Sequence, residues 1–349
     1  MHRARPLKTE TLRYVSLGTS GLKVSQICMG SWHLPRSKER DQFGALEVDI
    51  EALRRVVKTA MDMGLNFIDT ANRYHGAMSP VDLIHRGNSE KVLGEVLREY
   101  DRESYVISTK VGAEMTAWAN GKGLSRKHVF WQNRESLRRL QMDFIDVYLI
   151  HTSDPETPNL ETLRAMDDLI SMGKVHYIGS SNLSPEEIVN FMDLSKENRL
   201  NGFITLQEVY NLLESQIELT KMPLARHYGF SIMAYSPLAE GLLSGKYLSG
   251  IPEGSRASYS EALRRDITEE RLSVIRELAD FAKEKGITLP QLAIAWILNK
   301  QSSLGVSIVP IIGVSSEDQL RENLQAAEIN LTQDDVKAIQ AIIAESKAR

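Results

Sequence analysis

The chain has 349 residues, of which 42% are hydrophobic and 25% charged, and its formal net charge is −4. That length is enough to bury a large core, and the composition is ordinary for a globular protein. Basic and acidic residues are mixed along the whole sequence, which argues against a nucleic-acid-binding surface. No apolar run reaches the length of a membrane span. We therefore expect neither a nucleic-acid partner nor a membrane partner.

Cys28 is the only cysteine, so an internal disulfide is excluded. No Cys/His cluster has the spacing of a metal site, and we expect no metal. The apolar run 25–29 around Cys28 indicates an ordinary buried thiol. Residues 1–14 are polar and basic and lack the apolar core of a signal peptide. Together these features predict a protein of the reducing cytoplasm.

Short apolar runs alternate with longer amphipathic stretches along most of the chain. The first expected element is a β-hairpin over Leu12–Val24, which turns at Gly18–Gly21. Eight buried strands are then predicted at residues 26–30, 66–71, 105–111, 146–151, 175–179, 205–210, 231–235 and 306–313. Helices are predicted between them, among others at residues 88–100, 126–140 and 160–172, with two added helices at 289–299 and 333–346.

Eight strand–helix units favour a closed (β/α)8 TIM barrel over an open doubly wound sheet. The two common nucleotide-binding glycine motifs are absent, and Gly241–Lys246 is one residue too short for a phosphate-binding loop. We expect a single domain over 1–349, with its core at about 12–331, the hairpin as a cap on the barrel floor and a C-terminal helix at 332–347. Three long stretches are predicted without helices, at 78–87, 113–125 and 239–266.

Four ionisable side chains follow successive predicted strands. Asp69 ends the second strand with Tyr74 just beyond it, Lys110 ends the third and His151 ends the fourth. In a parallel barrel these positions meet at one mouth. A free tyrosine has a pKa of about 10. A nearby ammonium lowers that pKa, and a carboxylate keeps the ammonium charged. Each residue alone is more often a helix cap, an ion-pair member or a structural histidine. The four together predict a tyrosine acid–base site with His151 orienting a carbonyl oxygen.

The same residues resemble the catalytic tetrad of the aldo-keto reductases: Asp69-x-x-x-x-Tyr74, Lys110 in STK and His151 in IHTSDPETP. The resemblance runs from about Leu12 to Leu331 and implies reduction of aldehydes or ketones to alcohols, or the reverse, with a nicotinamide cofactor. It also implies nicotinamide contacts in GKVHYIGSSN, QEVYN and AYSPL, at Ser181, Asn182, Gln207 and Tyr235.

Two later segments, at 236–257 and 312–323, are similar to the potassium-channel β-subunit branch of that family and its bacterial relatives. The resemblance implies further cofactor contacts at Ser236, Pro237, Leu238, Gly241, Lys246, Arg256, Gly313, Ser315, Gln319, Glu322 and Asn323. A guanidinium suits the 2′-phosphate of the cofactor, and a helix that begins near Ser316 can bind phosphate. NADP(H) is therefore expected as the preferred cofactor, and NAD(H) is not excluded. The alternative interpretation of Arg256 is a solvated charge on a loop.

The sequence departs from its relatives directly after Tyr74, where residues 75–88 precede Ser89-Glu90. This insertion either reshapes the wall of the substrate pocket or forms a surface excursion without contact to it. Trp32, His75 and Trp118 are the substrate-pocket candidates, because aromatic side chains often line pockets. They are equally common in protein cores.

Two other functions stay open beside the enzyme. The channel-subunit resemblance allows a nicotinamide-binding sensor or regulatory subunit with little turnover. A barrel of another chemistry, such as a sugar-phosphate isomerase, is compatible with the fold alone. The resemblance also implies a homo-oligomer. A small carbonyl or alcohol substrate is expected, and its identity cannot be read from the sequence.

Overall fold

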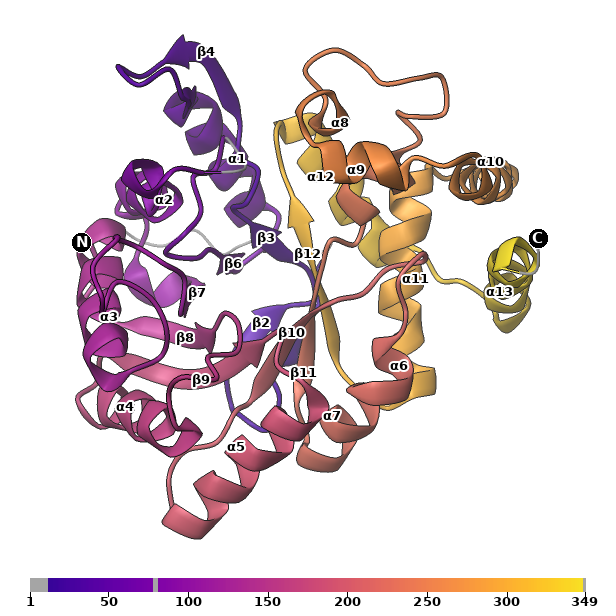
Figure 1. The fold of residues 1–349 in the computed structure, drawn as a ribbon. Helices are drawn as coiled ribbons and strands as arrows, with labels where there is room; N and C mark the ends of the chain where they lie inside the picture. The colour runs from indigo at the N-terminus through magenta and orange to yellow at the C-terminus, as the bar shows by residue number, and fades with distance from the viewer. Residues whose placement is uncertain (1–11, 78–80, 348–349) are drawn as a thin grey trace.

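The computed structural model describes residues 12–77 and 81–347. Its centre is a closed barrel of parallel strands in the order β10-β11-β12-β3-β6-β7-β8-β9, surrounded by helices (Figure 1). The predicted (β/α)8 TIM barrel is therefore confirmed. Residues 1–11, which carry most of the signal-peptide argument, lie outside the described part of the chain.

All eight predicted barrel strands are present, with bounds that differ from the prediction by a few residues. Nearly every strand residue is buried, because helices cover the outer face and side chains fill the interior. The barrel strands are β3 (Cys28–Gly30), β6 (Phe67–Asp69), β7 (Val106–Val111), β8 (Ile145–Ile150), β9 (Val175–Ser181), β10 (Thr205–Val209), β11 (Ser231–Tyr235) and β12 (Ile308–Gly313).

The predicted N-terminal hairpin closes the floor of the barrel. Its strands β1 (Tyr14–Ser16) and β2 (Lys23–Ser25) pair antiparallel, and Leu17 and Val24 join the apolar cluster that fills the lower interior. The turn approaches the barrel so closely that a Cβ on Gly18 would lie 1.9 Å from the Ile204 carbonyl oxygen. Gly18 also has φ +58°, a conformation that glycine adopts without strain. Only the opposite end of the barrel is therefore open for a site.

Helices follow the strands and cover the barrel. Several begin at a side-chain cap, and Ser184 and Thr288 each form a capping box. The α-helices are α1 (Ile50–Asp62), α2 (Asn88–Leu97), α3 (Arg126–Leu140), α4 (Asn159–Ser171), α5 (Pro185–Asn198), α6 (Ile217–Thr220), α7 (Met222–Tyr228), α8 (Arg256–Tyr259), α9 (Glu261–Asp266), α10 (Glu269–Glu284), α11 (Leu289–Leu304), α12 (Glu317–Gln325) and α13 (Gln333–Lys347). Short 3-10 turns are η1 (Leu83–His85), η2 (Arg102–Ser104), η3 (Ala239–Ser244) and η4 (Ala326–Glu328).

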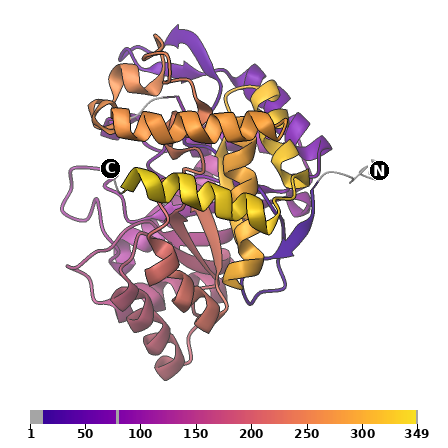
Figure 2. The ribbon, with the colours of Figure 1, turned by 90° about the vertical axis from the view of Figure 1, so that its right-hand side faces the viewer.

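Three features differ from the prediction. The helix predicted as an addition at 289–299 is α11, which packs on β12 as a barrel helix does; the added pair is α10 and α13, which lie side by side on the outside (Figure 2). The stretches 78–87 and 239–266 are not free of helices, since the first contains η1 and the second contains η3, α8 and α9. A second antiparallel hairpin, β4 (Arg36–Arg40) with β5 (Leu46–Val48), was not expected at all.

Candidate active site

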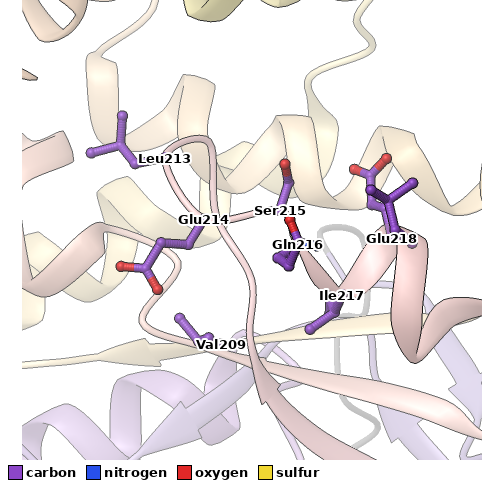
Figure 3. Close-up of a pocket in the computed structure, with 8 residues that line it drawn as sticks. Val209, Leu213, Glu214, Ser215, Gln216, Ile217 and Glu218 are labelled. Carbon is purple, nitrogen blue, oxygen red and sulfur yellow. The ribbon is translucent and has the colours of Figure 1, made fainter. Parts of the chain in front are cut away.

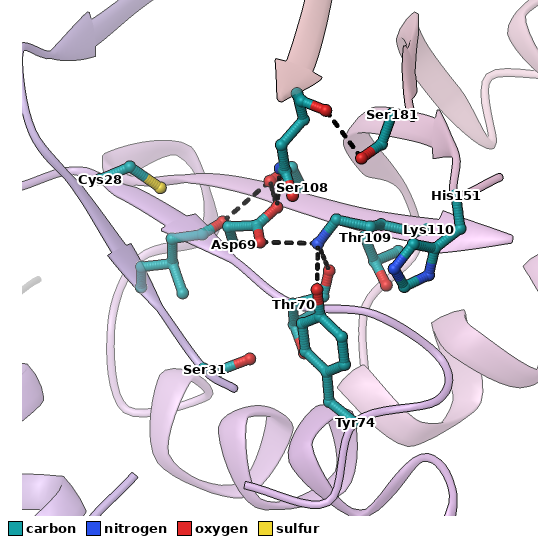
Figure 4. Close-up of polar contacts among 12 residues, drawn as sticks. Cys28, Ser31, Asp69, Thr70, Tyr74, Ser108, Thr109, Lys110, His151 and Ser181 are labelled. Atoms are coloured by element: carbon teal, nitrogen blue, oxygen red, sulfur yellow. Dashed lines mark hydrogen bonds and ion pairs between the residues drawn. The ribbon is translucent and has the colours of Figure 1, made fainter. Parts of the chain in front are cut away.

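Three of the four tetrad residues meet through one ammonium group at the open end of the barrel (Figure 4). The Lys110 Nζ donates to Asp69 Oδ2 at 2.7 Å, to the Thr70 carbonyl oxygen at 2.7 Å and to the Tyr74 hydroxyl oxygen at 3.1 Å. An ammonium has three hydrogens, so all of them are used. Because Lys110 donates to the Tyr74 oxygen, the hydroxyl hydrogen of Tyr74 is free to donate elsewhere.

The carboxylate of Asp69 is fixed from the other side as well. Its Oδ1 accepts hydrogen bonds from Ser108 Oγ at 2.7 Å and from Gln207 Nε2 at 2.9 Å. Asp69 and Lys110 are both buried. A buried ion pair is kept only when each charge has its partners, and here the two residues satisfy each other. The sequence reasoning missed Ser108, although it lies two positions before Lys110 and therefore on the same face of β7.

Burial decides the protonation state of the tyrosine. Desolvation raises the pKa of Tyr74 above its ordinary value, and the lowering effect of Lys110 does not offset it. Lys110 does lower the pKa of Tyr74, as expected, but burial raises it by more. The expectation that the pKa ends below its ordinary value is therefore wrong. Burial alone would lower the pKa of Lys110, but Asp69 and Tyr74 raise it above its ordinary value. At neutral pH the site thus holds an ammonium and a protonated phenol.

His151 follows β8 directly, and its ring meets the Tyr74 ring edge-on at 5.7 Å between centroids. Burial, together with the charges of Lys110 and Arg73, holds the pKa of His151 well below its ordinary value. The imidazole is therefore neutral at neutral pH. It can orient an oxygen by hydrogen bonding but is not charged to supply a proton, which leaves Tyr74 as the candidate acid of the site.

The four residues predicted to contact a nicotinamide form one hydrogen-bonded network beside His151. Ser181 Oγ donates to the Gln207 carbonyl oxygen at 2.8 Å, and Asn182 Nδ2 donates to Ser181 Oγ at 2.9 Å and to the His151 carbonyl oxygen at 3.1 Å. The Tyr235 hydroxyl donates to Asn182 Oδ1 at 2.9 Å. The network spans the ends of the neighbouring strands β9, β10 and β11, and Gln207 Nε2 connects it to Asp69 of the tetrad.

Left-handed backbone gathers at the ends of β9 and β11. Of the six non-glycine residues with positive φ among the described residues, four lie here: Asn182 (59°), Ser236 (53°), Ala239 (45°) and Glu240 (58°). Such conformations are strained and cluster at ligand sites. Gly241 has φ +99°, and a Cβ there would lie 2.9 Å from the Lys246 Nζ. Pro237, which is buried, and the half-buried Leu238 lie in the same turn.

Arg256 is tied down rather than free in solvent. It pairs with Glu240 Oε2 at 3.0 Å, and its Nη1 lies 3.2 Å from His33 Nε2, just beyond β3. The charge of Arg256, after the effect of burial, helps to bring the pKa of His33 down to about 3. The predicted alternative of a solvated loop charge is therefore excluded, and Arg256 joins η3 to the residues beyond β3.

The segment around α12 contains a side chain that lacks partners. Asn323 is fully buried, yet neither its Oδ1 nor its Nδ2 has a hydrogen bond within the described residues. An unsatisfied buried amide is costly, so a ligand with donors and acceptors fits this position. Nearby, the Ser315 backbone N–H and hydroxyl both donate to Gln319 Oε1 at 2.8 Å. Gly313 ends β12, and Glu322 lies half-buried next to Asn323.

The three substrate-pocket candidates lie in different surroundings. The Trp32 ring meets the Tyr74 ring edge-on at 4.6 Å and so flanks the tetrad directly. His75 is buried and turned into the insertion, where its ring lies 5.6 Å from that of His85. Trp118 is 71% exposed. It stacks on Trp131 of α3, beside a hollow of about 530 Å³.

A second hollow, of about 450 Å³, lies beyond β10 and is lined by Val209 and residues 213–219 (Figure 3). Its Glu218 is already engaged, by the Tyr210 hydroxyl at 2.6 Å and the Lys300 Nζ at 3.0 Å. Neither hollow includes a residue of the tetrad. Within residues 12–77 and 81–347, no helix could cross a membrane and no cluster of His, Cys, Asp and Glu could hold a metal ion.

Known proteins are similar in sequence to this chain over most of its length. The sequence model of the Aldo/keto reductase family matches residues 26–344. A "probable voltage-gated potassium channel subunit beta" from Oryza sativa subsp. japonica is 35% identical over 345 residues, 95% of this chain and 97% of that protein. A protein of the same description from Arabidopsis thaliana is 35% identical over 329 residues, 91% and 92% of the two chains. An L-glyceraldehyde 3-phosphate reductase from Escherichia coli is 32% identical over 338 residues, 94% and 91%. This chain belongs to the aldo/keto reductase family.

Proposed function

We propose that this chain is an NADP(H)-dependent oxidoreductase that reduces small aldehydes or ketones to alcohols, or runs the reverse reaction, with Tyr74 as the general acid and base. The observation that carries the proposal is the bond from Lys110 Nζ to the Tyr74 oxygen at 3.1 Å. This bond joins the buried ammonium of Lys110 to a protonated phenol whose hydrogen is free to donate. The neutral imidazole of His151 and the hydrogen-bonded network of Ser181, Asn182 and Gln207 lie beside it.

Each tetrad residue has a definite task in carbonyl reduction. Tyr74 donates its proton to the carbonyl oxygen as negative charge develops there. Lys110 holds the Tyr74 oxygen in place and stabilises the phenolate that remains. Asp69 keeps Lys110 charged and oriented through their 2.7 Å contact. His151, neutral because of its lowered pKa, hydrogen-bonds the same carbonyl oxygen. When bound, the cofactor supplies the hydride that the carbonyl carbon accepts.

The residues at the strand ends fit a dinucleotide phosphate. Ser181, Asn182 and Gln207 present amide and hydroxyl groups suited to a carboxamide, and Tyr235 offers its ring for stacking. The turn with Ser236, Pro237, Leu238, Gly241 and Lys246 suits the pyrophosphate, and Asn323 suits an adenine, with Gly313, Gln319 and Glu322 around it. Arg256 and Ser315 are the candidates for the 2′-phosphate, because a guanidinium pairs well with phosphate oxygens.

A depletion screen tests this function. The purified protein is incubated with aldehydes, ketones and sugar phosphates, with NADPH and NADH in parallel. The proposal expects steady consumption of cofactor with at least one carbonyl class, and faster consumption of NADPH than of NADH. If the protein binds neither cofactor, or reduces no carbonyl compound, the proposal is wrong.

A second function is supported by the relatives described as potassium channel β subunits. In this case the chain binds a nicotinamide cofactor and regulates a partner, with little turnover. Steady NADPH consumption above roughly 1 s⁻¹ is typical of an enzyme and favours the first function. Tight binding of NADPH with negligible turnover and a co-purifying partner favours the second. The homo-oligomer and the cytoplasmic location stay predictions.

A further inference from the structure

Arg73 immediately precedes the catalytic tyrosine in sequence and extends to the surface. Its side chain is exposed, and its guanidinium carbon lies 5.9 Å from the centre of the Trp32 ring. Trp32 in turn meets Tyr74 edge-on at 4.6 Å. The cation therefore lies at the rim of the catalytic centre, positioned by the same aromatic ring that flanks the tyrosine.

The positive charge of Arg73 is not neutralised by a neighbour. Within the described parts of the chain, no carboxylate comes within ion-pair distance of Arg73, and its one specific contact is with Trp32. Lys110, the other cation of the site, is already neutralised by Asp69 at 2.7 Å. Of these two cations, Arg73 is therefore the one that gives the mouth of the site an uncompensated positive charge.

The insertion adds a second cation. Arg86 follows the 3-10 turn η1, just before the Gly87 cap of α2, and donates to the backbone carbonyl oxygen of Glu114. Burial and the charge of Arg73 lower the pKa of Arg86, and the Glu114 carboxylate opposes this effect. The charges of Arg73 and Arg86 therefore repel each other, and only Arg86 interacts with an exposed carboxylate, that of Glu114. Holding like charges together costs free energy that a bound anion would offset.

We propose that Arg73, with Arg86 beside it, selects small carbonyl substrates that carry an anionic group, either a phosphate or a carboxylate. The anionic group binds to the guanidinium groups at the rim while the carbonyl oxygen meets Tyr74 and His151. This inference rests on the proposed carbonyl reduction and names its substrate class. It agrees with the relative described as L-glyceraldehyde 3-phosphate reductase, whose named substrate carries a phosphate.

Arg73 lies apart from the residues predicted to bind the cofactor. The cofactor residues gather on β9, β10, β11 and β12, whereas Arg73 follows β6 on the other side of the barrel. A cation there is separated from the predicted phosphate contacts of the cofactor, which lie at residues 236–256 and 313–323. It therefore lies on the side of the mouth that the predicted cofactor contacts leave for the substrate.

The test compares matched pairs of anionic and neutral substrates. Glyceraldehyde 3-phosphate is paired with glyceraldehyde, and 4-carboxybenzaldehyde with 4-formylbenzamide, so that the two pairs separate phosphate from carboxylate. In Arg73→Met, the anionic-to-neutral ratio of kcat/KM is expected to fall by about tenfold or more in at least one pair, because a charge-assisted hydrogen bond is lost. The loss lies mainly in KM, since the contact is made before and during the reaction alike.

Two further variants act as controls. Arg73→Lys keeps the charge and recovers part of the ratio, although a point charge replaces the guanidinium fork. Arg98→Met removes one cation from the exposed C-terminal end of α2, which lies toward the barrel floor, and leaves the ratio unchanged. An increase in ionic strength raises KM for the anionic substrates only.

A binding measurement separates this inference from the proposed function. Glycerol 3-phosphate is titrated into the holoenzyme, and tryptophan fluorescence is followed because Trp32 lies beneath the guanidinium. The inference expects binding that weakens about tenfold or more in Arg73→Met, whether or not the protein turns over carbonyl compounds. Unchanged binding, or equal losses of kcat/KM on anionic and neutral partners, overturns the inference. The latter result would mean that Arg73 acts only on Tyr74. Absence of turnover with retained, Arg73-dependent binding overturns the proposed function instead.

Discussion

The two sides of the barrel mouth are built in different ways. On the side of β6, β7 and β8, the polar atoms of Asp69 and Lys110 are satisfied by each other and by neighbours such as Ser108 and Thr70. On the side of β9, β11 and β12, strained residues such as Ser236 combine with a buried amide, Asn323, that has no hydrogen-bond partner among the described residues. The charged groups of the first side are satisfied by protein neighbours, whereas the second side has strained backbone and an unsatisfied buried amide, features that fit a ligand site.

This difference explains how the site divides its work. A proton donor needs fixed geometry before substrate arrives, and the Asp69–Lys110–Tyr74 chain provides it without a ligand. A cofactor site gains affinity when binding relieves strain and satisfies buried polar groups. We therefore expect changes on the catalytic side to reduce the rate or the stability of the free protein, and changes on the cofactor side to reduce affinity.

The largest effect is expected for Tyr74→Phe. The change removes the hydroxyl that donates the proton and leaves the ring that packs against Trp32. Carbonyl reduction should fall by about a hundredfold to ten-thousandfold, the usual contribution of a positioned acid. Cofactor affinity, measured by fluorescence titration, should stay the same. Near wild-type reduction in this variant would show that the proton comes from elsewhere.

The second effect concerns stability on the catalytic side. Lys110→Met leaves the Asp69 carboxylate buried without its cation, which should cost about 3–5 kcal/mol of the free energy of unfolding. Urea denaturation of the cofactor-free protein measures this loss. The double variant Lys110→Met/Asp69→Asn should recover much of the stability but not the activity. An equally unstable double variant would show that packing, and not charge, holds this side together.

A smaller effect with the opposite pattern is expected at Asn323. Leucine at this position removes an unpartnered buried amide, so Asn323→Leu should not lower the stability of the cofactor-free protein. Its cofactor affinity should fall by about tenfold, as expected for the loss of one or two hydrogen bonds. Calorimetric titration with NADPH gives the affinity, and Gln325→Leu at the exposed C-terminal end of α12 serves as a control. If affinity stays unchanged while stability drops, the amide is a structural group and the comparison fails.

The smallest effect is expected from pH. Because burial raises the pKa of Tyr74, the phenol stays protonated, and reduction should decline only above its ordinary pKa of about 10. Because the pKa of His151 is lowered, the imidazole stays neutral down to its ordinary value of about 6.5 and beyond. The rate of reduction should therefore be nearly constant between these limits. A titration of kcat/KM with a midpoint near neutrality would contradict both assignments.

Much of the fold was readable from the sequence because the barrel strands are buried on both faces. The tetrad was readable because strand ends in a parallel barrel share one mouth. The hairpin β4–β5 was not, since its residues are polar and its turn depends on Asp41, whose Oδ1 accepts from Phe43 and Ala45 backbone N–H groups. The helices within 239–266 are similarly short and depend on contacts such as the Arg36 bond to Tyr259 at 2.7 Å.

One error had a signal that was available in the sequence, and another had none. Helix α11 is apolar around most of its circumference, which is typical of a helix buried between layers, while α10 is amphipathic and lies outside. The direction of the Tyr74 pKa could not be read in the same way. The sequence shows the charged neighbour Lys110, but the degree of burial, which outweighs it, depends on how loops and strand ends close around the ring.

The central claim is tested most directly by following a labelled hydride. The protein is incubated with [4,4-²H₂]NADPH and glyceraldehyde 3-phosphate or another carbonyl compound from the screen, and the alcohol is analysed by mass spectrometry. We predict deuterium at the carbinol carbon of the alcohol made by the wild-type protein. In Tyr74→Phe the rate at which labelled alcohol forms should fall as much as the rate of NADPH consumption. Bound NADPH without any labelled alcohol would contradict the account and identify the chain as a cofactor-binding subunit.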